Sequence, residues 1–300
     1  MTKLPKPLTY TLAVFAMLFW GMTFVWSKVV FKYYDPIVTI TIRLLISSII
    51  MGLMMLLFFK SAFKNPLKHI KWFLILALFE PFLYFIGESF GLLLVDASIT
   101  AVVISTIPIF TAIMGVYFFK EKLSRLNIAG IAISFMGVLL MLFNNQFQIK
   151  VSFIGISLLM LAVFSAVGYS TMLRKISPIY HPVQIILVQN LIGFFMFSFL
   201  WIFIDTSYVW NTKLNYELWS SLLMLAVFGS SLAFMFFTIT IREFGVAKSN
   251  VFSNLIPIFT AITAYFVLDE KFTIVKLSGM AIAIFGLFLT QRKAKTEIEL

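Results

Sequence analysis

Long apolar stretches separated by short polar connections form the hydrophobic pattern of this chain. Ten stretches follow one another, near residues 8–30, 36–59, 70–94, 97–119, 126–143, 152–172, 182–204, 216–240, 245–268 and 274–291. Each has roughly 18–25 residues, which as a helix is enough to cross about 30 Å of hydrocarbon. The pattern therefore predicts an all-α integral membrane protein with ten transmembrane helices in a lipid bilayer.

The same pattern contains an internal repeat. The string IPIFTAI occurs at residues 107–113 and again at 256–262, an offset of 149. Further pairs align at this offset: Glu121 with Glu270, Gly130 with Gly279, and Gly137 with Gly286. Upstream, Asp35-Pro36 aligns with His181-Pro182 at an offset of 146. We therefore expect two five-helix repeats, over residues 8–143 and 152–291. An odd number of spans per copy places the second copy upside down, an arrangement typical of secondary transporters.

Composition narrows the chemistry. Hydrophobic residues make up 61% of the 300 residues and charged residues 12%, whereas soluble domains carry about 25% charged residues. With no cysteine, the chain has no disulfide, thiolate metal site or cysteine nucleophile. The two histidines, His69 and His181, fall in polar connections, so we expect neither a histidine metal cluster nor a cofactor.

Charge indicates the orientation. A net charge of +11 is compatible with nucleic acid, but the lysines lie between apolar segments and form no polar face. If the N-terminus is inside, the inner connections hold 16 Lys and Arg and the outer ones 6. This bias predicts that both termini are cytoplasmic, and it favours a membrane protein over a nucleic-acid partner.

Several motifs resemble a known family. The first is Trp20-Gly21 followed by Lys28, and the second is Asp35-Pro36 with Arg43. The third occurs once in each repeat: a proline, a glutamate thirteen residues after it, and a glycine nine residues after the glutamate. Together they resemble two EamA domains of the drug/metabolite transporter superfamily over nearly the whole chain. The resemblance implies a ten-helix inner-membrane carrier, usually an exporter of amino acids or related small metabolites. The second copy departs from the first: Gln189 stands in place of Arg43, and Ala166-Val167 or Val167-Gly168 in place of Trp20-Gly21.

Charged residues within spans are the main functional candidates. Arg43 lies eight residues into span two, where a charge requires a protein or water partner. It could anchor a substrate carboxylate or form a structural pair with a glutamate. In span three, Glu80, Tyr84 and Glu88 share an arc of about 100° on an ideal helix. We hypothesise that Glu80 or Glu88 takes and releases a proton during transport. The alternative is that Arg43 permanently neutralises one of them while the other faces an aqueous vestibule.

Prolines and smaller polar groups complete the candidate set. Pro81, Pro108 and Pro257 lie inside spans and should kink them. For Pro108 and Pro257 we expect a hinge or cavity-lining position, the alternative being a static kink. Trp20 and Tyr169 could stack on a substrate. Polar sets that mark possible cavity faces include Asn190 with Gln189, and Asn254 with Asn250. Glu121 and Glu270 are expected to secure helix ends by charge pairing.

These features predict a secondary transporter of small metabolites, with protons as a possible coupling ion. The expected substrate-binding residues are Trp20, Arg43, Glu80, Tyr84, Glu88, Tyr169, Asn190 and Asn254. The chain has no nucleotide-binding G-x-x-x-x-G-K-[ST], no G-x-S-x-G and no H-E-x-x-H, so neither ATP hydrolysis nor enzymatic hydrolysis is expected. An integral-membrane enzyme acting on lipids and a channel stay as alternatives. The substrate, the direction of transport and the oligomeric state are left open.

Overall fold

A computed structural model describes residues 4–119, 124–141, 152–205, 207, 209 and 215–290. All regular elements in these ranges are helices. Glu121, the ends of the expected spans at residues 142–143 and 291, and the lysine-rich C-terminus lie outside the described residues.

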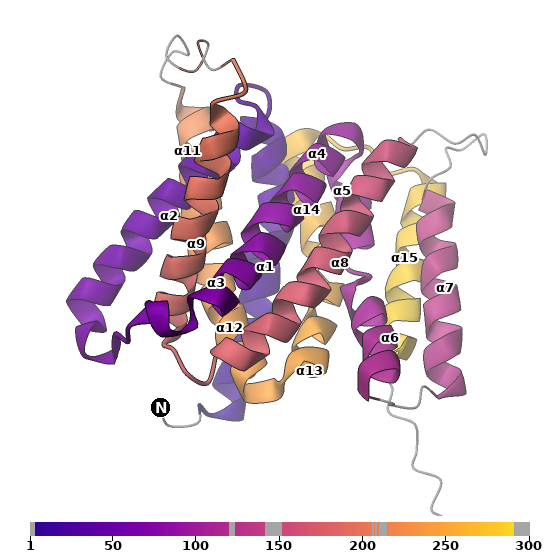
Figure 1. Cartoon of the computed structure of the whole chain (residues 1–300). Coiled ribbons are helices and arrows are strands. Elements are labelled where there is room, and N and C mark those ends of the chain that lie inside the picture. The colour runs from indigo at the N-terminus through magenta and orange to yellow at the C-terminus, as the bar shows by residue number, and fades with distance from the viewer. Residues whose placement is uncertain are drawn as a thin grey trace, which may run out of the picture.

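The elements of the first half are α1 (Lys6–Val30), α2 (Pro36–Phe58), two short 3-10 turns (Lys60–Ala62 and Pro66–His69), α3 (Ile70–Ala77), η3 (Leu78–Leu83), α4 (Tyr84–Leu94), α5 (Ala97–Ile104), α6 (Ile107–Phe119) and α7 (Arg125–Met141). Those of the second half are α8 (Phe153–Ile176), α9 (Pro182–Trp201), α11 (Tyr216–Met224), η4 (Leu225–Ala233), α12 (Phe234–Phe244), α13 (Val246–Asn250), η5 (Val251–Leu255), α14 (Ile256–Leu268) and α15 (Ile274–Thr290). The helices stand side by side between two ends, with the N-terminus at one of them (Figure 1).

The helical segments correspond closely to the predicted spans. Eight of them are long and apolar enough to cross a membrane, and α7 and α15 are shorter apolar helices. Helices satisfy their own backbone hydrogen bonds, as hydrocarbon requires. The observed ends differ from the predicted ones by about four residues or fewer, as at Ile176 and Phe244. The prediction of an all-α membrane protein with ten helical spans is confirmed.

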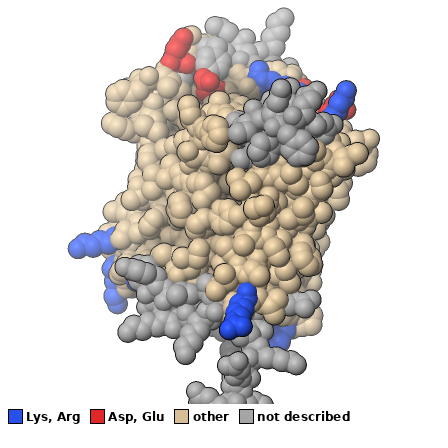
Figure 2. Space-filling view, turned by 90° about the vertical axis from the view of Figure 1, so that its right-hand side faces the viewer, with Lys and Arg blue, Asp and Glu red and all other residues tan. Residues whose placement is uncertain are grey.

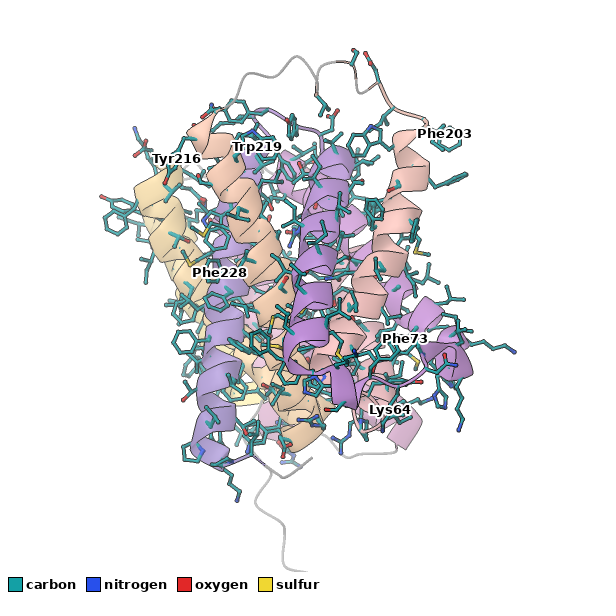
Figure 3. All side chains as sticks on the ribbon, turned by 90° about the vertical axis from the view of Figure 1, so that its left-hand side faces the viewer. Lys64, Phe73, Phe203, Tyr216, Trp219 and Phe228 are labelled. Carbon is teal, nitrogen blue, oxygen red and sulfur yellow. The ribbon has the colours of Figure 1, made fainter. Side chains whose placement is uncertain are left out.

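Charged and apolar side chains occupy different levels of the surface. On the face shown in Figure 2, acidic and basic side chains gather at the upper end, lysine and arginine alone gather toward the lower end, and a band without charge separates the two ends. Exposed Tyr216 and Trp219 lie near one end, and Lys64 lies at the other (Figure 3). Interfacial aromatic residues and terminal cations are typical of a protein that spans a bilayer.

Four spans are interrupted in their middle. Span three changes into the π-helical segment η3 around Pro81, and its repeat equivalent, span eight, has the π-helical segment η4. In span four the helix breaks between α5 and α6 at residues 105–106, and in span nine it passes through the 3-10 segment η5. Pro257 occupies the first turn of α14, where the missing amide hydrogen is not needed. The regular α-helix therefore changes at or beside each of the three prolines, while a hinge role for Pro108 and Pro257 stays a prediction. The π-helical segment in span eight, which has no proline, was not predicted.

Glycine contacts between α7 and α15 show the symmetry of the two repeats. A Cβ on Gly137 would lie 2.3 Å from the Ala283 nitrogen and 2.6 Å from the Gly279 oxygen. A Cβ on Gly286 would lie 2.3 Å from the Ser134 nitrogen and 2.7 Å from the Gly130 oxygen. Each contact maps onto the other at the offset of 149, so these helices meet as equivalent partners, as an inverted repeat requires.

The first helix of each half packs mainly on the opposite half. α1 contacts η4, α12, η5 and α14, whereas α8 contacts α3, η3, α4, α5 and α6. The remaining helices form like-with-like pairs across the halves, α2 with α9 and α7 with α15. The two sequence repeats are therefore interlocked rather than laid side by side.

An ion cluster also joins the halves, at the end of the bundle where α1 finishes. Lys276 Nζ lies 2.8 Å from an Asp96 carboxylate oxygen and also contacts the Glu270 carboxylate. Ser98 donates to the same glutamate through its hydroxyl. The side chains of Lys276 and Glu270 are only 8% and 10% exposed. The predicted charge pairing at Glu270 is confirmed, and the cluster links the start of α5 to the start of α15.

Candidate functional site

A narrow cavity lies between the two halves, in the region of the interrupted helices. The empty space between its lining atoms, including the part open to solvent, is about 430 Å³. The halves contribute equally to its lining, the first with Met17, Trp20, Glu80, Tyr84, Ile104 and Ile107, the second with Ala166, Tyr169, Phe237, Asn250, Ser253 and Ile256. Binding near the repeat interface and beside discontinuous helices is the usual arrangement in inverted-repeat transporters.

Three pairs of lining residues are equivalent in the two repeats. Ile104 and Ser253 are separated by the offset of 149, as are Ile107 and Ile256. Trp20 and Ala166 are separated by the offset of 146. The cavity therefore lies about the pseudo-symmetry axis, and the exchange of tryptophan for alanine makes its two sides chemically different.

The interruption of span three places Glu80 in this cavity. Glu80 has φ −150° and ψ 120°, so its backbone is extended within an otherwise helical segment. Its side chain is 4% exposed and lines the cavity. Among the described residues its carboxylate has no hydrogen-bond or ion-pair partner within the protein. A carboxylate in such a position is expensive unless a ligand or proton satisfies it.

Aromatic rings form one wall of the cavity. The Trp20 ring meets Phe237 edge-on at 4.9 Å and Phe234 at 5.1 Å. Tyr169 also meets Phe234 edge-on, at 5.9 Å, and its hydroxyl donates to Gln189 Oε1 at 3.1 Å. Edge-to-face pairs of this kind hold rings at fixed positions. The wall therefore offers a largely apolar surface of fixed rings, in which the Tyr169 hydroxyl already has an acceptor.

Polar groups of span nine form the other side. Asn250 Nδ2 donates to Thr111 Oγ1 at 2.8 Å and to Ser170 Oγ at 3.3 Å. The Ser253 hydroxyl donates to the Asn250 carbonyl oxygen at 2.7 Å. Asn254, the next residue, is 1% exposed, and neither polar atom of its side chain has a partner among the described residues. The end of α13 and the 3-10 segment η5 thus bring amide and hydroxyl groups to the cavity that Glu80 also lines.

Arg43 lies outside the cavity lining. Its Nε donates to Ser230 Oγ at 2.8 Å, and its guanidinium lies 4.4 Å from the centre of the Phe85 ring. Asn190 joins the same region, donating to Ser47 Oγ at 2.8 Å and to the Ser230 carbonyl at 3.0 Å. These contacts connect α2, α9 and η4. One hydrogen bond and a cation–π contact hold the Arg43 guanidinium, and no carboxylate in the described part of the chain lies within 4.0 Å of it.

Glu88 is separated from the cavity too. It is 2% exposed, accepts a hydrogen bond of 3.1 Å from the adjacent Ser89, and is not among the cavity-lining residues. Arg43 is close enough to interact electrostatically with both Glu88 and Glu80. The structure therefore distinguishes the two glutamates, because only Glu80 faces the space between the halves.

The structure brings together half of the predicted substrate-binding set. Trp20, Glu80, Tyr84 and Tyr169 line the cavity; Arg43, Glu88, Asn190 and Asn254 lie in the surrounding protein. Pro108 and Pro257 do not line the cavity either, but the residue before each, Ile107 and Ile256, does. Six of the remaining lining residues are apolar, and nothing in the sequence marked them as residues of a cavity. Ser253 could have been proposed as a cavity residue, because it is a polar residue four positions before Pro257. Ile104 has the same position relative to Pro108 in the first repeat.

Comparison with known proteins agrees with this architecture. The model of the EamA-like transporter family matches residues 7–143 and 153–292. An uncharacterized transporter from Archaeoglobus fulgidus is 23% identical over 92% of this chain and 95% of its own length. A probable amino-acid metabolite efflux pump from Salmonella typhimurium is 23% identical over 93% of each chain. A crystal structure that covers 96% of this chain and 97% of its own shares the fold, with a TM-score of 0.71 at 15% identity.

The fold and the cavity between interlocked repeats define a multi-pass membrane transporter. The chain belongs to the EamA-like transporter family. Because the family and the relatives are transporters, the alternative of a lipid-modifying enzyme is set aside.

Proposed function

We propose that this protein is a secondary active exporter of amino acids or closely related small metabolites. In this proposal it works in the cytoplasmic membrane by alternating access, with both termini on the cytoplasmic side. The observation that carries the proposal is the cavity between the halves, in which the unpartnered Glu80 carboxylate faces aromatic and amide groups.

The cavity suits a small zwitterion with an apolar side chain. Glu80 could pair with a substrate ammonium group. On the span-nine side, the Asn250 amide and the Ser253 hydroxyl could donate to the carboxylate end of the substrate by leaving their present acceptors, Thr111, Ser170 and the Asn250 carbonyl. Trp20 and Phe237 offer a surface for an apolar or aromatic side chain. The Salmonella typhimurium relative, named as a probable amino-acid metabolite efflux pump, supports this class of cargo.

The packing of the helices indicates which of them would move together during transport. Since α1 packs on α12 and α14 while α8 packs on α4 and α6, each mobile body would combine one span of a repeat with two of the other. The two bodies would then rock about the cavity, with the paired helices α2–α9 and α7–α15 as the fixed frame. The interrupted spans would absorb the change in backbone angles.

Glu80 is the proposed proton-coupling group. A carboxylate that alternates between binding a substrate ammonium and binding a proton would link export to an inward proton gradient. Glu88, enclosed in protein beside Ser89, would instead balance the charge of Arg43. Arg43 and Asn190 would hold the frame helix α2 against η4.

Counterflow in proteoliposomes tests the proposal. Vesicles are loaded with one unlabelled compound, which is an amino acid, a nucleoside or a dicarboxylate. A radiolabelled mixture of compounds of the same class is added outside, and its uptake is measured with and without a pH gradient. We expect accelerated uptake for amino acids, loss of the pH-gradient effect in Glu80→Gln, and its retention in Glu88→Gln. Glu80→Gln that keeps full gradient-driven transport would remove Glu80 as the coupling group. If no internal solute accelerates uptake, and uptake instead rises with the external concentration without saturation, the result favours the channel alternative.

A further inference from the structure

A second cavity, separate from the transport cavity, lies at the end of the bundle that carries the N-terminus. Three segments form it: the connection after α2, the turn between α8 and α9, and the C-terminal end of α12. The empty space between its lining atoms, including the part open to solvent, is about 1050 Å³. We call it the basic pocket because, among the residues that the structure describes, Lys64, Arg174 and Arg242 line it together with one acidic residue, Glu243. Figure 3 shows Lys64 at this end of the molecule.

Hydrogen bonds to the backbone hold the cations of the basic pocket. Arg174 Nη1 donates to the carbonyl oxygens of Ile241 at 2.9 Å and Arg242 at 2.8 Å. Lys64 Nζ donates to the Ile179 carbonyl oxygen at 2.7 Å. Glu243 lies 3.6 Å from Arg242 Nε and offsets one charge. Two net positive charges therefore face the pocket from chain segments far apart in sequence.

Buried apolar residues separate the basic pocket from the transport cavity. Along α8, Tyr169 lines the transport cavity, Arg174 lines the basic pocket, and Leu173 between them is fully buried. Along α12, Phe237 and Arg242 stand in the same relation, and fully buried Ile241 lies between. The two cavities share no lining residue. The basic pocket is therefore a site of its own and not the floor of the transport cavity.

The surroundings of the basic pocket combine charge with exposed apolar surface. Ile179, Pro178 and Ala62 are part of its lining. Immediately beside the pocket residues, Phe63 is 53% exposed, and Phe58 at the end of α2 is 72% exposed. At the end of a membrane-spanning bundle, such side chains lie at the level where lipid headgroups meet acyl chains.

We propose that the basic pocket binds the phosphate of an anionic phospholipid headgroup. The guanidinium groups of Arg174 and Arg242 and the ammonium group of Lys64 would contact the phosphate oxygens, since arginine matches phosphate geometry and lysine supplies a point charge. Phe63 and Phe58 would contact the first part of the acyl chains. Pockets of this kind between transmembrane helices bind acidic lipid headgroups.

Lipid titration of the purified full chain tests this proposal. Native mass spectrometry would measure binding of phosphatidylglycerol and of phosphatidylcholine to the wild type and to Lys64→Glu. Each unit of charge near the surface changes binding about fivefold, so reversal at Lys64 should weaken phosphatidylglycerol binding about 25-fold. Lys68→Glu is the matched control: it is the same change on the same exposed connection, outside the pocket. We expect it to stay within about twofold of the wild type.

A second variant and two soluble probes complete the test. Arg242→Gln should weaken phosphatidylglycerol binding about fivefold, and phosphatidylcholine should bind weakly to all variants. Inorganic phosphate and glycerol 1-phosphate should not displace the lipid at equal concentration. Equal weakening by Lys64→Glu and Lys68→Glu would overturn the proposal, as would equal binding of the two lipids. Displacement by either soluble phosphate would overturn the lipid assignment and favour a free phosphate compound as the ligand.

Discussion

The glycine contact between α7 and α15 gives a sharp test of the pseudo-symmetric fold. An added Cβ on Gly137 would lie 2.3 Å from a backbone nitrogen of α15, whereas such atoms ordinarily stay about 3.4–4 Å apart. Backbone cannot rotate away as a side chain can, so Gly137→Ala should push the two helices apart by about 1 Å. The same holds for Gly286→Ala, because its contact with α7 is the symmetric counterpart.

The expected magnitude follows from two opposing effects. Overpacking of a close contact costs about 1–3 kcal/mol. Replacing glycine by alanine inside a helix gains about 0.5–1 kcal/mol. Each variant should therefore lose about 1 kcal/mol, and at most about 2.5 kcal/mol, in the free energy of unfolding. Gly52→Ala in α2 is the control, since its Cβ would meet only Leu187 Cδ1 at an ordinary 3.7 Å, and it should keep or slightly raise stability.

Unfolding of the detergent-solubilised protein by increasing SDS, followed by circular dichroism, measures these differences. Gly137→Ala and Gly286→Ala should lower the midpoint by similar amounts, and Gly52→Ala should not lower it. The reasoning is refuted if Gly137→Ala is as stable as Gly52→Ala, because the helices would then not be in backbone contact. A large loss in one glycine variant alone would contradict the equivalence of the two repeats.

Two further predictions concern the ends of the bundle. Lys276→Met should lower the free energy of unfolding by about 2 kcal/mol, because it leaves Glu270 enclosed without its cation; this value lies between those for exposed and buried ion pairs. Adding Glu270→Gln should restore part of the loss in the same SDS titration. If stability does not recover, the ion pair is not the cause of the loss. Burial and the neighbouring charge of Arg242 lower the pKa of His181 below its ordinary value, and its Nδ1 accepts from the Val183 amide at the start of α9. Its contribution to stability should therefore be complete above about pH 6.5 and be lost as the pH falls toward its folded pKa. NMR titration of a variant carrying His69→Gln, in which His181 is the one remaining histidine, would contradict this if the pKa lies at or above 6.5.

Much of the architecture was predictable because it depends on local patterns. Apolar length set the spans, and the offset between the two IPIFTAI strings predicted the repeat that Gly137 and Gly286 display in three dimensions. Proline identified the interruptions near Pro81, Pro108 and Pro257. The interlocking of α1 and α8 with the opposite halves could not be read from the sequence, since apolar faces of transmembrane helices do not specify their partners.

The candidate site was only half predictable, for a physical reason in span three. The expected arc assumed an ideal helix from Glu80 to Glu88, but the extended backbone at Glu80 changes the direction of its side chain. Glu80 therefore lines the cavity and Glu88 does not. Similarly, Arg43 was expected to anchor a substrate carboxylate or to pair with a glutamate, and no pattern in the sequence indicated that Ser230 and the ring of Phe85 would be its direct contacts. Contacts of this kind, between residues far apart in the chain, cannot be predicted from the spacing of residues within one helix.

The central claim is that the cavity opens to one side of the membrane at a time, and the absence of native cysteine makes it directly testable. Ser253→Cys places one thiol in the cavity lining, and Ser61→Cys, on an exposed connection, marks the orientation of the protein in vesicles. Labelling rates with a membrane-impermeant maleimide would be measured from each side, with and without the amino acid that gives the strongest counterflow loaded opposite. We predict that the amino acid raises labelling of Ser253→Cys from one side and lowers it from the other, with Ser61→Cys unchanged. Alternating access through this cavity would be contradicted if the labelling rates of Ser253→Cys from the two sides rise or fall together. It would also be contradicted if the amino acid changes neither rate.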